Sequence, residues 1–95
     1  MYLRITRGRF DSARYDEMLP ILGDVKAAVL TLPGSQSVES GSDRSAGRVG
    51  IVSTWDTAEH ASFTRETAGG VAELVRRAQA IGVQFEPPEI YEIIT

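Results

Sequence analysis

The chain has 95 residues, so a single domain over residues 1–95 is expected, and 42 % hydrophobic residues provide for a small core. Ten basic residues against 13 acidic ones, a net charge of −3, argue against a nucleic-acid partner, because phosphate binding requires clustered Lys and Arg. With no Cys and a single His, the sequence predicts neither a metal site nor a cofactor. The first ten residues lack the apolar core of a signal peptide and no later run could span a membrane, so a cytoplasmic location without membrane contact is expected.

The first third of the chain predicts a strand followed by a helix. Residues 2–6 alternate apolar and polar side chains, as a half-buried strand does. Asp11 is a suitable N-cap, and apolar residues then recur at steps of three and four, at Tyr15, Met18, Leu22, Val25, Val29 and Leu32. Pro20 predicts a kink or a division into two shorter helices, and a Pro-Gly pair at 33–34 ends the helix.

The middle of the chain predicts a β-hairpin. Residues 36–40 form a weak strand by propensity, and residues 43–47 supply the turn, with Gly47 suited to a left-handed position. Residues 48–55 form the stronger strand, which carries apolar side chains on both of its faces. A strand of this kind is normally covered on both sides.

The last third predicts a second helix and a final strand. Asp56 to Glu59 have the pattern of a capping box, so a helix is expected to begin there, to loosen at Gly69-Gly70 and to end at Gly82. Residues 83–85 and 90–95 are extended, with two prolines between them. Since proline cannot donate to a ladder, this strand is expected at a sheet edge or broken.

The order strand, helix, strand, strand, helix, strand predicts an α+β, ferredoxin-like βαββαβ fold, a four-stranded antiparallel sheet with both helices on one face. On the other face Val52, Ile90 or Ile94 would meet water, at about 25 cal/mol for each Å² left wet. We therefore expect a homodimer in which two sheets pack face to face into a barrel, with the C-terminal strand reaching toward the partner.

The junction S-T-W-D-T-x-E-H-A at residues 53–61, after a hairpin and before a Pro-broken last strand, resembles the dimeric α+β barrel superfamily, in its antibiotic biosynthesis monooxygenase-like branch. The resemblance extends from Tyr2 to Ile94. It implies a pocket between the sheet and the helices of each subunit. It also implies one of two activities, cofactor-free oxygenation of polycyclic aromatic phenols or oxidative degradation of haem.

Trp55 and His60 allow two interpretations. With Asp56 as N-cap they would occupy the two positions of a hydrophobic staple, which packs the start of a helix. Alternatively, the indole stacks on a flat aromatic ligand while the imidazole exchanges a proton with a phenol. The two interpretations are compatible at the mouth of a pocket.

The haem-degrading activity is disfavoured by the residues. The resemblance implies an Asn on the first strand and an iron-ligating His about three turns into the second helix. Here the first strand has no Asn, and the position ten after Trp55 is Arg65. His60 lies only one turn into the predicted helix, so it is poorly placed as a substitute.

The cofactor-free oxygenase requires less of the protein, because an electron-rich phenolate can itself reduce oxygen. The candidate catalytic residues are His60 as base and Trp55 as stacking wall, and the candidate ligand-binding residues are Arg4, as partner of an oxyanion, together with Trp55 and Phe63. Arg4 could instead form an ion pair with Glu92 at a dimer seam, and Phe63 could be core. The alternative function is a non-catalytic dimeric module that binds a ligand or assists a larger pathway.

Overall fold

The computed structural model describes residues 1–64 and 67–95 of the chain. The elements in chain order are β1 (Tyr2–Arg9), the 3-10 turn η1 (Ser12–Arg14), α1 (Tyr15–Leu30), β2 (Ser35–Asp43), β3 (Arg48–Trp55), α2 (Ala58–Ala61), α3 (Gly69–Ala80), β4 (Gln84–Phe85) and β5 (Glu89–Glu92). None of the helices in these two ranges is long and apolar enough to cross a membrane.

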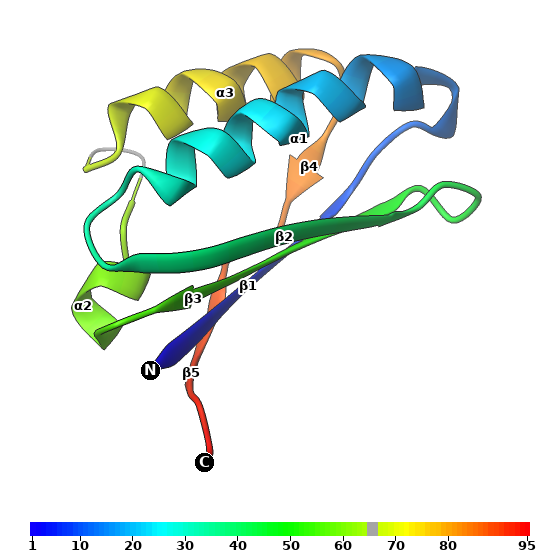
Figure 1. The fold of residues 1–95 in the computed structure, drawn as a ribbon. Helices are drawn as coiled ribbons and strands as arrows, with labels where there is room; N and C mark the ends of the chain where they lie inside the picture. The colour runs from blue at the N-terminus through cyan, green and yellow to red at the C-terminus, as the bar shows by residue number, and fades with distance from the viewer. Residues whose placement is uncertain (65–66) are drawn as a thin grey trace.

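The strands form one antiparallel sheet in the order β2-β3-β1-β4, with β5 also pairing with β1. Helices α1 and α3 lie together over one face of this sheet, and the other face is open (Figure 1). The predicted ferredoxin-like α+β fold is confirmed. The predicted strand over residues 48–55 has the bounds of β3, and the two prolines separate β4 from β5 at the sheet edge.

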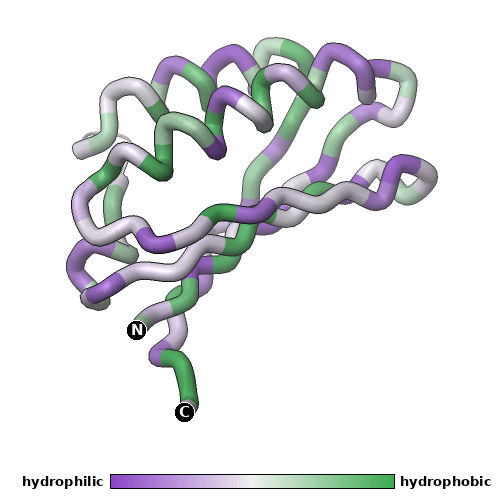
Figure 2. The backbone as a smooth tube through the Cα atoms, in the orientation of Figure 1, coloured by the Kyte–Doolittle hydropathy of each residue, from purple (hydrophilic) through white to green (hydrophobic). Residues whose placement is uncertain are grey.

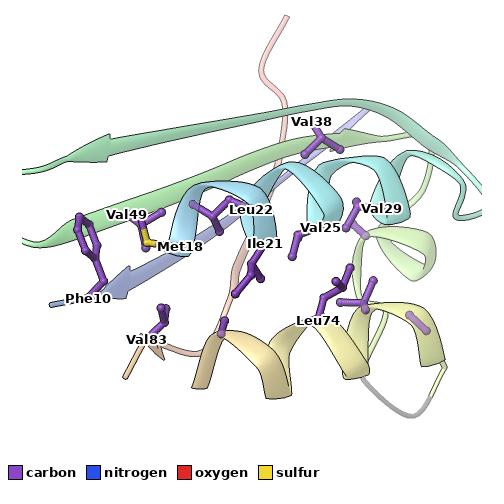
Figure 3. Packing of buried hydrophobic residues seen from close by; sticks show 14 of the residues in the cluster. Phe10, Met18, Ile21, Leu22, Val25, Val29, Val38, Val49, Leu74 and Val83 are labelled. Carbon is purple, nitrogen blue, oxygen red and sulfur yellow. The ribbon is translucent and has the colours of Figure 1, made fainter. Parts of the chain in front are cut away.

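The core lies between the helix pair and the covered face of the sheet (Figure 3). Met18, Leu22, Val25 and Val29 of the predicted apolar stripe are all buried, and Ile21 is buried beside them. Trp55 and Met18 are the largest side chains that are fully enclosed.

The sequence suggested a division of the first helix at Pro20, but the helix is not divided there. Asp11 accepts a hydrogen bond from the Ala13 amide at 2.9 Å and so caps η1, after which α1 runs as one helix from Tyr15 to Leu30 with Pro20 inside it. Thr31 follows as the C-cap, and Gly34 takes the positive φ of 80° that reverses the chain.

The second helical region begins with α2, and both the start and the end of α2 differ from the prediction. The N-cap is Thr57 rather than Asp56, and α2 ends after four residues at Ala61. Gly69 and Gly70 do not loosen a helix, since they form the first turn of α3. The predicted capping box and the single helix from Asp56 are therefore wrong.

The pairing register decides which side chains face the helices. Arg4 pairs with Ser53 and with Ile90, and Ser53 is only 3 % exposed, so Arg4 and Ile90 lie on the covered face. Leu3 and Ile5 therefore point to the open face with Val52. The expectation that Ile90 faces the open side is wrong, whereas Val52 is 39 % exposed there.

The C-terminal residues beyond β5 leave the body of the molecule. Figure 2 shows a hydrophobic end of the chain that extends away from the sheet. Ile94 is 98 % exposed. This apolar end follows β5, which pairs with the first half of β1.

Candidate functional site

A cavity of about 140 Å³ lies between the covered face of the sheet and the two long helices. Most of the described residues that line it are apolar, and the polar ones are Arg4, Thr6 and Glu86. Among the described residues, the lining consists of Arg4, Thr6, Val25, Val29, Ile51, Phe63, Val71, Val75, Phe85, Glu86 and Pro88. A mostly apolar hollow with a few polar groups is the usual form of a small-molecule site.

Arg4 is the cation among the described residues that line this cavity. Its Nη1 atom donates to the carbonyl oxygens of Ala61 at 2.7 Å and of Phe63 at 3.0 Å, and its guanidinium carbon lies 3.8 Å from the centroid of the Phe63 ring. Burial lowers the pKa of Arg4 from its usual value, although an arginine remains charged at neutral pH.

Arg4 has no carboxylate partner among residues 1–64 and 67–95. None of the ion pairs found in these ranges includes it. Within the described chain Arg4 and Glu92 form no ion pair, and Glu92 accepts a hydrogen bond from the Tyr2 hydroxyl. A pair between Arg4 and Glu92 at a dimer seam stays a prediction. Two carbonyls compensate the charge only through their dipoles, so the guanidinium can still attract an anion.

Trp55 lies beneath Phe63 rather than in the wall of the cavity. The two ring centroids are 5.2 Å apart at an interplanar angle of 44°, and the indole Nε1 donates to Ser53 Oγ at 2.8 Å. Trp55 is fully buried and is not among the residues that line the cavity. Its position supports the ring of Phe63, which does line it.

His60 lies outside the cavity lining, at the surface of α2. Its Nδ1 is 2.7 Å from Asp56 Oδ1, and the hydrogen bond from His60 lowers the pKa of the Asp56 carboxyl. With Thr57 as N-cap, the staple positions fall on Asp56 and Ala61. Trp55 and His60 are therefore not a hydrophobic staple.

Of the predicted site residues, the structure brings Arg4 and Phe63 together at the cavity and places Trp55 behind them. Thr6 and Glu86, the other polar groups among the described lining residues, were not predicted as site residues. Thr6 lies two residues after Arg4 on β1, so the two side chains face the same side of the sheet. The prediction of Arg4 as a site residue could therefore have been extended to Thr6. Glu86 follows the short strand β4, and no local pattern in the sequence indicates that it reaches this cavity.

The haem-degrading alternative requires an iron-ligating His at the position that Arg65 occupies. Arg65 lies outside the described residues. β1 has no Asn at any of its eight positions. Within residues 1–64 and 67–95, no group of three or more His, Cys, Asp or Glu side chains is placed to hold a metal ion.

Comparisons with known proteins identify the fold. No family model matches the chain, and no curated protein matches it either. Among solved structures, the chain is similar to a candidate antibiotic biosynthesis monooxygenase from Deinococcus radiodurans, with a TM-score of 0.82, 18 % identity, and coverage of 100 % of this chain and 94 % of that one. A second such candidate, from Nitrosomonas europaea, gives a TM-score of 0.79 at 14 % identity, with both chains fully covered.

A third solved structure is a mutant form of SnoaB, a cofactor-independent oxygenase from Streptomyces nogalater. The TM-score is 0.74 at 12 % identity, and the match covers 99 % of this chain and 93 % of that one. The chain therefore has the fold of the antibiotic biosynthesis monooxygenase-like structures over its whole length, as the resemblance in residues 53–61 implied.

Proposed function

We propose that this protein is a cofactor-independent oxygenase that binds a compact phenol in the cavity beside Arg4. The observation that carries the proposal is a guanidinium at an apolar cavity without a carboxylate partner among the described residues. Such a cation stabilises the ionised form of a bound hydroxyl, because an opposite charge close by lowers its pKa. The similarity to SnoaB supports oxygen as the second substrate.

The proposed reaction converts a phenol and dioxygen into a quinone and water. Arg4 holds the phenolate oxygen, and Glu86, an exposed residue of the cavity lining, accepts the proton. The electron-rich ring then transfers an electron to dioxygen, and the two radicals combine at the ring carbon para to the oxygen. One oxygen atom stays on that carbon as the new carbonyl. The other leaves as water with the two hydrogens that the hydroxyl and the para carbon lose.

The volume of the cavity limits the substrate. About 140 Å³ is smaller than the roughly 300–1,000 Å³ typical of sites for drug-sized ligands. We therefore expect a phenol with one ring to fit better than the polycyclic phenols that the resemblance suggested. Phe63 supplies an aromatic surface for such a ring, and Trp55 keeps Phe63 in place.

Oxygen consumption with a graded panel of one-ring, two-ring and three-ring phenols tests this proposal. Wild-type protein should consume one dioxygen for each quinone formed, fastest with the one-ring members. The variants Arg4→Met and Phe63→Ala should lose most of this uptake. No uptake by the wild type with any member, or equal uptake by Arg4→Met, would contradict the proposed activity.

A non-catalytic ligand-binding module is the second candidate, and the position of His60 favours it. The single imidazole of the chain contacts Asp56 and is not part of the cavity lining, so the cavity contains no histidine base. If the wild type binds a phenol but consumes no oxygen, and Arg4→Met binds the phenol more weakly, the result would favour this module.

The catalytic roles of His60 and Trp55, and the cytoplasmic location, stay predictions.

The open face of the sheet supports a homodimer as part of the same proposal. Val52 is 39 % and Tyr91 50 % exposed, and the register places both beside Leu3 and Ile5 on that face. A second copy packed against this face would remove the apolar side chains from water. The exposed apolar end at Ile94 is then close to the region where the two copies would meet.

A further inference from the structure

α2 is too short to be stable by itself. A helix of four residues makes at most one turn, and forming a first turn is unfavourable without tertiary contacts. Its position must therefore come from groups outside the helix that bind its two ends. The structure shows such groups at both ends of α2, and they involve two different parts of the chain.

The first end of α2 is bound to Gly34. The carbonyl of Gly34 accepts a hydrogen bond from the Asp56 amide at 3.0 Å. Asp56 Oδ1 and His60 Nδ1 lie so close to the α-carbon of Gly34 that a β-carbon at this position would collide with both atoms. The paired side chains of Asp56 and His60 therefore pack directly on the backbone of residue 34.

His60 is held by two hydrogen bonds. Its amide donates to Thr57 Oγ1 at 3.1 Å, and its ring contacts Asp56 Oδ1 at 2.7 Å. Asp56 is ionised at neutral pH, since its pKa is lowered, and an ionised carboxylate can only accept. The proton of this hydrogen bond is consequently on Nδ1 of His60, so the pair has a defined tautomer.

The other end of α2 is bound to Arg4. The carbonyl of Ala61, directly after His60, and that of Phe63 both accept hydrogen bonds from the Arg4 guanidinium, which also covers the Phe63 ring. These carbonyls lie where α2 ends. The position of the guanidinium in the cavity thus depends on the position of α2.

We propose that His60 is a positioning residue, which with Asp56 fixes α2 on Gly34 so that the carbonyls of Ala61 and Phe63 hold Arg4 in the cavity. In this role the imidazole never touches the bound molecule. The proposal rests on the proposed function only for the consequence that ligand affinity follows the position of Arg4. The positioning itself can be measured on the free protein.

The test observes Arg4 by NMR, through the side-chain protons that the Phe63 ring current shifts and through the Nε–H group. In His60→Ala the ring-current shift should decrease and the Nε–H signal should broaden or exchange faster. In His60→Asn both should stay near the wild-type values, because the carboxamide nitrogen replaces Nδ1 as donor to Asp56. Glu59→Ala changes a neighbouring side chain of the same turn and serves as the matched control.

Gly34→Ala tests the same contact from the other side. The added methyl group collides with the pair, so Arg4 should show the changes of the His60→Ala variant while the amide spectrum of the core is retained. Unchanged Arg4 signals in His60→Ala, or equal changes in His60→Asn and His60→Ala, would overturn the proposal. So would a His60→Asn protein that keeps its Arg4 signals but loses oxygen uptake, since His60 would then act in the chemistry.

The outcomes separate this inference from the proposed function. If the wild type consumes no oxygen but His60→Ala shifts the Arg4 signals, the positioning role stands and the oxygenase fails. If uptake is present and independent of His60 while the Arg4 signals stay in place, the oxygenase stands and the positioning role fails.

Discussion

The Arg4 guanidinium contacts Phe63 twice, with its carbon 3.8 Å from the ring centroid and its Nη1 3.0 Å from the carbonyl oxygen of the same residue. One side chain on β1 therefore fixes both the backbone and the ring of a residue 59 positions away in the sequence. This arrangement connects the stability of the segment after α2 with the charge of the cavity.

Arg4→Met should therefore lower both stability and ligand affinity. Hydrogen bonds to charged groups contribute about 1.5–3 kcal/mol, and a cation over an aromatic ring about 0.5–1 kcal/mol at exposed sites. Because the methionine stem keeps part of the packing, we expect a loss of about 2 kcal/mol in the free energy of unfolding. Urea denaturation measures this loss directly.

Arg76→Met is the matched control for this variant. Arg76 lies on α3 in an exposed pair with Glu73 at 2.5 Å, three residues away along the helix. Exposed pairs of this kind contribute less than about 0.5 kcal/mol to stability. The midpoint of urea denaturation of Arg76→Met should therefore stay close to that of the wild type. Equal losses in the two variants would show that the contacts of Arg4 to Ala61 and Phe63 do not stabilise the protein.

Trp55→Phe should destabilise the protein through a single hydrogen bond as well as through lost volume. The indole Nε1 donates to Ser53 Oγ, and both residues are buried, so phenylalanine leaves the hydroxyl without this donor. An unsatisfied buried polar group costs about 1–3 kcal/mol, to which the smaller ring adds the effect of a cavity. Thermal or urea unfolding of the single variant gives the total.

A double-mutant cycle with Ser53→Ala separates the two contributions. If the hydrogen bond matters, the Trp55→Phe and Ser53→Ala changes should be non-additive, since each removes the same bond. The double variant should then be more stable than the sum of the two losses implies. Strict additivity would mean that the loss in Trp55→Phe comes from packing and not from this hydrogen bond.

The contact of Asp56 with His60 should make stability depend on pH in the acid range. The folded-state pKa of Asp56 is lowered, first by its hydrogen bond with His60, so the folded protein binds the proton less readily than the unfolded chain does. The contribution of Asp56 is therefore fully present above the ordinary Asp pKa of about 3.9, and it is lost as the pH falls through the lower folded-state value.

Comparing the wild type with Asp56→Asn over this range measures that contribution. The stability difference between the two proteins should be constant near neutral pH and should shrink as the pH falls below about 4. Asp16→Asn, on the exposed side of α1, provides a comparison at a carboxylate that forms none of the ion pairs found among the described residues. A difference that does not change with pH would show that the carboxylate of Asp56 is not stabilised in the folded state.

The local signals of the sequence were sufficient for the elements that depend on local chemistry. The strand over residues 48–55, the capping role of Asp11 and the reversal at Gly34 all follow from side-chain alternation, a short polar side chain or a missing β-carbon. These features need no knowledge of distant residues. The order of elements then determined the antiparallel fold.

The errors occurred where a distant residue decides the local structure. The helix that begins after Thr57 ends at Ala61, and two carbonyls at that end accept hydrogen bonds from Arg4, which no pattern around residue 61 could indicate. Similarly, the alternation over residues 2–6 predicts one buried face of β1, and Leu3 and Ile5 are the apolar side chains of that pattern, although the register places them on the open face. A sheet that is apolar on both faces makes this choice ambiguous from alternation alone.

The apolar side chains on the open face of the sheet allow a test of the dimer. If a second copy covers the open face, a charge introduced there must be buried without a partner, which destabilises the association strongly. Val52→Glu on β3 should therefore shift the protein from dimer to monomer, and Tyr91→Glu should do the same from β5, on the other side of β1.

Sedimentation velocity at micromolar concentration measures this shift directly, since the monomer has a mass of 10.3 kDa. Leu30→Glu is the matched control, because Leu30 is 45 % exposed at the end of α1, on the helix layer rather than on the open face. The control should sediment like the wild type. A wild type that stays monomeric, or a Leu30→Glu protein that dissociates as readily as Val52→Glu, would exclude the open face as the interface, and the exposed Val52 and Tyr91 would then need another explanation.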